Sequence, residues 1–88
     1  MTSQQIYEEL KIVAEQKGLP VRLEMGDFDG GICTVKERRV ILINRRHDLP
    51  RRVHVIARAL YASGLDDVFV KPAIREIIDD EMARTRVN

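Results

Sequence analysis

The sequence predicts an α+β fold with the element order α-β-β-β-α-α, in which a three-stranded antiparallel sheet packs against a central buried helix. Apolar residues recur at helical spacing in three separate stretches. Between the first two of these stretches, apolar and polar residues alternate, and one short run is continuously apolar, which indicates strands. A chain of 88 residues is the size of one domain, so we expect a single domain over residues 1–88.

The first helix is predicted over about residues 3–17, because the sequence has a capping signal at its start and a termination signal at its end. Thr2 and Gln5 have the spacing of a capping box, which satisfies two amide groups at a helix start. Gly18 is placed for a left-handed C-terminal cap, and Pro20 forbids continuation. The apolar stripe of this helix consists of Ile6, Leu10, Val13 and Ala14.

Three strands are predicted at residues 21–25, 32–35 and 40–43. The first alternates apolar and polar residues, as a half-buried strand does. The third is continuously apolar, which is typical of a central strand buried on both faces. Because each linker is too short for a parallel crossover, we expect an antiparallel meander.

The second helix is predicted to begin after Asp48, a good N-cap, and to end near Gly64. It is apolar around much of its circumference, so we expect it to be the core helix, with Leu60 buried against strand 40–43. An extended linker over residues 66–70 then leads to a third helix that opens at Pro72. Its apolar side consists of Ile74, Ile77, Ile78 and Met82.

Composition limits the class of protein. Apolar residues make up 44% of the chain and charged residues 33%, which fits a folded domain and not a disordered segment. No apolar run is long enough to span a membrane, and none near the N-terminus is typical of a signal peptide. The single cysteine cannot form an intramolecular disulfide. We therefore expect a cytoplasmic domain with no membrane association.

Residues 40–62, VILINRRHDLPRRVHVIARALYA, resemble the active-site region of small zincin-type metallopeptidases. In that family a strand ending in Asn leads through a Leu-Pro helix start into a helix with a His-Glu-x-x-His motif. The alignment that follows Ala57 places Arg58 and Ala62 at the two histidine positions and Ala59 at the glutamate position. Arginine and alanine supply no lone pair for zinc, and Ala59 cannot act as a general base. The resemblance therefore implies a scaffold without a metal, a cofactor or peptidase activity.

Other residues with useful chemistry form no recognisable motif. His47 and His54 have no carboxylate or thiol at conventional metal-ligand spacing. Residues 27–30 match only a fragment of a calcium loop, and we interpret them as a strand connection. Cys33 is more typical of a small buried apolar residue than of a nucleophile, although a dyad with His54 stays open as the least favoured alternative.

Basic residues concentrate in the middle of the chain. Residues 36–58 have eight basic and two acidic side chains, a net charge of +6, whereas the net charge of the whole chain is +1. Arginine binds phosphates and carboxylates through paired hydrogen bonds. The candidate surface for an anion or a partner consists of Arg38, Arg39, Arg45, Arg46, Arg51 and Arg52.

These patterns predict a non-enzymatic binding or interaction domain whose partner is a protein. The alternative is a nucleic-acid-associated protein that uses the arginine-rich segment 38–58, but no aromatic side chain interrupts that segment to stack on bases. The apolar side of the third helix suggests a homodimer through Ile74, Ile77, Ile78 and Met82, and the alternative is that this helix folds back onto the core.

Overall fold

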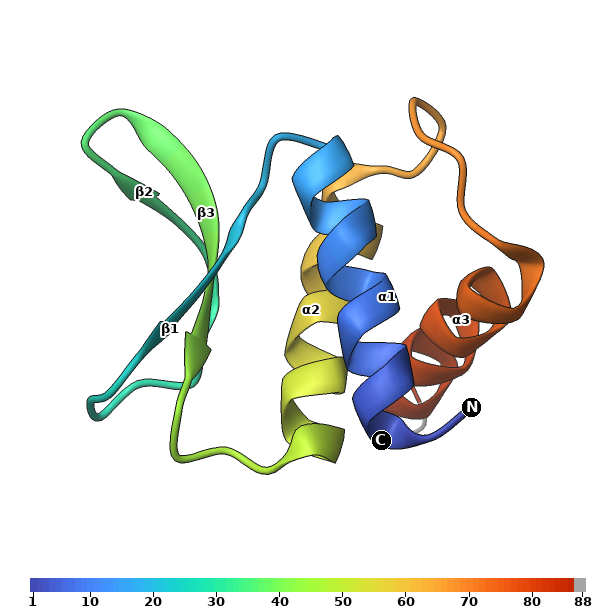
Figure 1. Ribbon diagram of the computed structural model, residues 1–88, viewed down its shortest axis with the longest axis horizontal. Helices are drawn as coiled ribbons and strands as arrows, with labels where there is room; N and C mark the ends of the chain where they lie inside the picture. Colours follow the sequence, from blue (N-terminus) through green and yellow to red (C-terminus); the bar gives the residue numbers. More distant parts are fainter. Residues whose placement is uncertain (87–88) are drawn as a thin grey trace.

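The computed structural model describes residues 1–86 and has two layers, a three-stranded sheet and three helices that all lie on one side of it (Figure 1). The prediction of an α+β fold is therefore confirmed. The elements in chain order are α1 (Ser3–Gln16), β1 (Val21–Glu24), β2 (Gly31–Val35), β3 (Arg38–Asn44), α2 (Leu49–Ser63) and α3 (Pro72–Arg86).

The sheet is mixed, so the expectation of an antiparallel meander is wrong in one pairing. The strand order is β1-β3-β2, with β3 antiparallel to β2 but parallel to β1. The linker from β1 to β2 and the linker from β2 to β3 are each too short for a parallel crossover, but β1 and β3 are joined by both linkers together. The connection from β1 to β3 is the whole of residues 25–37, which includes β2, and these 13 residues are long enough for a parallel crossover.

The helix ends agree with the capping signals. Thr2 and Gln5 form a reciprocal capping box at the start of α1, and Gly18 follows that helix with a φ of +74°. The side chain of Asp48 accepts a hydrogen bond from the backbone N–H of Arg51 at the start of α2. Local sequence therefore determines where these two helices begin and end.

The core lies between the helices and one face of the sheet. On β3, Ile41 and Ile43 belong to the buried cluster and are 0% and 1% exposed. Leu60 of α2 belongs to the same cluster and is 0% exposed, as the sequence predicts. α2 contacts both β2 and β3, and α1 packs beside α2. This arrangement makes α2 the central helix of the domain.

The apolar side of α3 packs onto this core. Ile74 and Ile78 are fully buried, Met82 is 9% exposed, and Ile77 is partly buried against the same cluster. The expectation that these four side chains form an exposed homodimer surface is therefore wrong. They pack within the chain, and the alternative that the helix folds back onto the core is what the structure shows. Ion pairs Lys17–Asp67 and Lys71–Glu9 also join the linker before α3 to α1.

Candidate partner-binding cleft

Within residues 1–86, β2 is an edge strand, and no other strand pairs with the backbone groups on its outer side. Lys36 and Glu37 form a two-residue turn in which both residues have positive φ, so Val35 and Arg38 form the hydrogen-bonded pair next to it. Hydrogen-bonded and non-hydrogen-bonded pairs alternate along an antiparallel ladder, so Ile32 and Thr34 are in non-hydrogen-bonded pairs. Their N–H and C=O groups therefore point away from β3. The bond from Ile41 N–H to Pro20 C=O, on the β1 side of β3, agrees with this alternation.

A cleft of about 530 Å³ lies between the start of this edge strand and α2. One wall is formed by residues 29–32, and the other is a single face of α2. Its apolar lining includes Val55, Ala59 and Ala62. Val55 and Ala59 are 8% and 6% exposed and belong to the core, so Ala62 is the exposed one of these three residues beside the edge strand.

Gly30 allows the sheet and the helix to come this close. Its φ is +97°, and a Cβ atom added to it would lie 2.7 Å from the carbonyl oxygen of Leu42 and 3.3 Å from Cγ1 of Val55. A larger residue is thus excluded both by the backbone conformation and by contact. Gly30, at the end of the connection before β2, and Gly31, the first residue of β2, are part of the wall of the cleft.

Three basic side chains line the same cleft from α2. Arg51, His54 and Arg58 are at positions i, i+3 and i+7, which lie on one face of a helix. Arg51 pairs with Asp29 at 3.6 Å, and both side chains are at least half exposed. Within the described residues, Arg58 makes no hydrogen bond or ion pair. Among the described lining residues there is one acidic side chain, Asp29, against two arginines, so the charge of this lining is positive.

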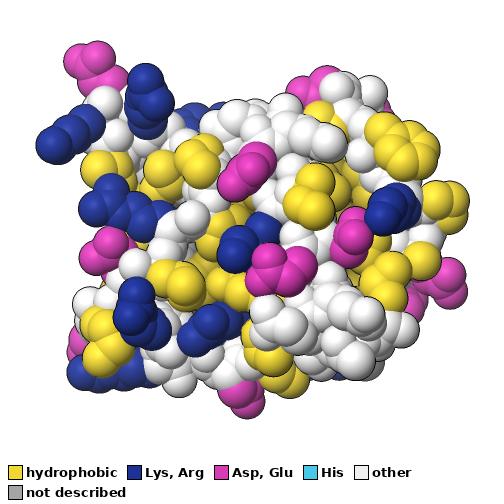
Figure 2. All heavy atoms as spheres, viewed as in Figure 1, with side chains coloured by type: hydrophobic (Ala, Val, Ile, Leu, Met, Phe, Trp, Pro, Cys, Tyr) yellow, Lys and Arg dark blue, Asp and Glu magenta, His cyan; other side chains and the backbone are white. Residues whose placement is uncertain are grey.

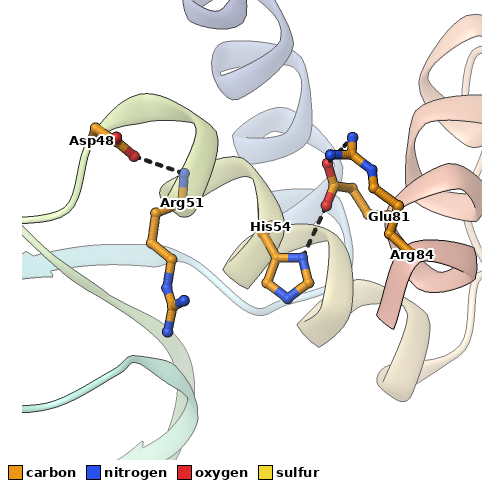
Figure 3. Close-up of polar contacts among 5 residues, drawn as sticks. All are labelled: Asp48, Arg51, His54, Glu81 and Arg84. Carbon is orange, nitrogen blue, oxygen red and sulfur yellow. Dashed lines mark hydrogen bonds and ion pairs between the residues drawn. The ribbon is translucent and has the colours of Figure 1, made fainter. Parts of the chain in front are cut away.

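His54 is held in place by α3 (Figure 3). Its Nδ1 lies 2.9 Å from Oε2 of Glu81, and that carboxylate also accepts a hydrogen bond from Arg84 at 2.9 Å. Because Glu81 is only 12% exposed, this contact orients the imidazole ring and joins α2 to α3. His54 also lines the cleft, and its other ring nitrogen, Nε2, makes no hydrogen bond within residues 1–86.

The six arginines singled out from the sequence do not form one surface. Arg38 and Arg39 begin β3, next to its turn, whereas Arg45 and Arg46 follow the other end of that strand. Seven residues of extended chain separate Arg38 from Arg45 by about 23 Å. Figure 2 shows that Lys and Arg side chains of the face in view gather over the sheet, with acidic side chains among them.

Arg52 has a structural role. Its guanidinium group donates hydrogen bonds to the backbone carbonyls of His47 and Arg45, at 2.9 and 2.8 Å, and lies over the ring of Tyr7. Arg52 thereby fixes the loop between β3 and α2. Of the six, Arg51 alone lines the cleft, and Arg58 was not among them. The seven-residue spacing of Arg51 and Arg58 is the signal that places both on one face.

The three positions that the zincin resemblance singles out lie together. Arg58, Ala59 and Ala62 all line the cleft beside β2. Cys33 pairs with Val40, so it lies on the opposite face of the sheet from Ile32 and Ile41, which face the helices. Cys33 is therefore separated from His54 by the sheet, and the two do not form a dyad.

Within residues 1–86, no three histidine, cysteine, aspartate or glutamate side chains are grouped so that they could hold a metal ion. None of the helices described is long and apolar enough to cross a membrane. Comparisons with protein-family models, with curated proteins and with solved structures found no match.

Proposed function

We propose that this chain is a non-enzymatic binding module that takes up an extended segment of a partner protein in the cleft between β2 and α2. The segment adds to the sheet beside β2 and packs against the exposed residues that α2 contributes to the cleft, which include Arg58 and Ala62. The observation that supports this most directly is the free outer edge of β2 next to a cleft of about 530 Å³. A binding role without peptidase chemistry also fits Arg58, Ala59 and Ala62, which offer neither a metal ligand nor a base.

Strand addition fits the chemistry of this edge. Ile32 and Thr34 each offer one donor and one acceptor, at the spacing that an added strand matches. Backbone pairing supplies affinity with little demand on sequence, whereas the neighbouring cleft supplies contacts for side chains. The main alternative, nucleic acid bound through segment 38–58, is less favoured because Arg38 and Arg39 lie at the opposite end of β3 from the other arginines of the segment.

The test is a substitution at the free edge. Thr34→Pro removes an N–H that points outward, so the bonds between β2 and β3 stay intact. Thr34→Val keeps that N–H and is the matched control. The probes are peptides selected from a displayed library of random linear sequences on the parent protein. We expect Thr34→Pro to weaken their binding about tenfold or more and Thr34→Val to leave it within about twofold.

Amide exchange in the parent protein provides a second measurement that does not depend on a variant. On addition of a selected peptide, the amide protons of Ile32 and Thr34 should exchange more slowly, since both become hydrogen-bonded. Peptides that bind equally well to Thr34→Pro, or that leave both amides unchanged, would show that the edge of β2 is not the binding site.

A further inference from the structure

We infer that the segment bound in this cleft is acidic, with carboxylate side chains that pair with Arg58 and Arg51. This inference rests on the proposed function and adds the chemistry of the partner. Its starting point is the charge of the cleft, which has two arginines and a histidine on α2 and only Asp29 as an acidic side chain. A segment with carboxylates complements that charge.

Arg58 is the strongest indication. It is exposed, it lines the cleft, and it makes no ion pair or hydrogen bond within the described residues. Other arginines of the helices are paired: Arg84 donates to Glu81, and Arg52 donates to two backbone carbonyls. A planar guanidinium group that is left unpaired beside a free strand edge is suited to a carboxylate on an added strand.

Arg51 already shows the kind of contact that we expect. Its guanidinium group lies 3.6 Å from a carboxylate oxygen of Asp29, whose side chain is 89% exposed. So long a contact between exposed groups is weak, and an incoming carboxylate can replace it at little cost. Figure 3 shows that His54 points toward Glu81 of α3, whereas no dashed line joins Arg51 to that helix.

The spacing of the two arginines fits an extended segment. Seven residues of helix place Arg51 and Arg58 about 10.5 Å apart along the axis of α2. Side chains on one side of an extended strand recur every second residue, about 6.6 Å apart, and the long arginine stems cover the difference. We therefore expect acidic residues at alternate positions of the bound segment. His54, held by Glu81, lies between the two arginines on the same helix face.

The experiment repeats the peptide selection on charge variants. The parent protein should enrich peptides with Asp or Glu at alternate positions. Arg51→Glu with Arg58→Glu should shift the enrichment toward Lys and Arg. The matched control is Arg38→Glu, an exposed arginine next to the turn at the other end of β3, which should leave the acidic preference unchanged. For one selected acidic peptide, Arg58→Gln should weaken binding about two- to fivefold, as expected for an exposed ion pair.

The outcomes separate this inference from the proposed function. Peptides that bind the edge, as shown by loss of binding to Thr34→Pro, but that have no acidic preference would overturn the acidic partner and leave the binding module in place. Selected peptides that are indifferent to Thr34→Pro would overturn the proposed function itself. A random-sequence RNA that displaces the peptide and binds less well to Arg58→Gln would identify nucleic acid as the ligand of the cleft and overturn the inference.

Discussion

Asn44 should be one of the most sensitive polar residues of this domain. It ends β3 and is 3% exposed. Its Nδ2 donates to the carbonyl oxygens of Gly26 and Phe28, at 2.9 and 2.8 Å, and its Oδ1 accepts from the backbone N–H of Arg46 at 3.0 Å. One side chain thus joins the connection before β2 to the loop that leads to α2.

The expected cost of Asn44→Ala follows from these three bonds. Each contributes about 1 kcal/mol net to the free energy of unfolding, so the substitution should remove about 3 kcal/mol. Backbone groups left without partners in a buried place add to this cost. Because a domain of this length is stable by only about 4–13 kcal/mol, the loss is a large part of the total.

Urea denaturation of the parent and the variants measures this effect. Asn44→Asp keeps the acceptor but loses both donors, and it places a carboxylate against two carbonyl oxygens, so it should be at least as destabilising as Asn44→Ala. The control is Gln4→Ala, which removes one exposed hydrogen bond to Glu8 and should change stability by no more than about 0.5 kcal/mol. Asn44→Ala with a midpoint equal to that of the control would refute the reasoning.

Three other predictions concern stability. Leu60→Ala should cost about 2–5 kcal/mol in urea denaturation, because Leu60 is 0% exposed in the central helix; a midpoint equal to that of the parent would contradict its place in the core. Replacing Lys36-Glu37 by Asn-Gly should raise stability by about 1 kcal/mol or more, since both residues have positive φ in a turn that favours Asn-Gly; an unchanged midpoint would argue against strain there. The hydrogen bond from Lys17 holds the pKa of Asp67 below its usual value, so its stabilising effect is present at neutral pH and is lost as the pH falls through the acidic range; Asp67→Asn should therefore flatten the acid side of the stability curve, and a variant with the parent's pH dependence would contradict this.

Much of the fold could be predicted from short-range signals. The capping box at Thr2 and the N-cap at Asp48 act within one turn of helix, so the sequence alone indicates where α1 and α2 begin. The buried position of Leu60 follows from helical periodicity in the same way. The pairing of β1 with β3 depends instead on contacts between residues about 20 positions apart, for which the local pattern has no signal.

The candidate site is harder to predict, because the number of charged residues in a segment does not show which of their side chains lie on the same surface of the folded chain. Segment 38–58 was correctly identified as basic, but β3 separates its arginines, and Arg52 binds backbone carbonyls of the chain itself. Sequence patterns single out Arg58 only as a residue that cannot bind zinc and as the end of the basic segment, although its spacing from Arg51 places both on one helix face. The contact of Glu81 with His54 joins residues 27 positions apart, and no spacing rule predicts it.

The position of the most apolar strand explains why the cleft exists. β3 has the longest apolar run, so it takes the central place in the sheet, where both of its edges are paired. In a meander with β2 in the centre, the N–H and C=O groups of Ile32 and Thr34 that point away from β3 would bond to β1. With β3 in the centre, β1 pairs with it in parallel and β2 is left at the edge beside α2. The apolar run that stabilises the core thus also leaves the backbone of β2 free, and the same sequence feature accounts for the sheet order and for the proposed binding site.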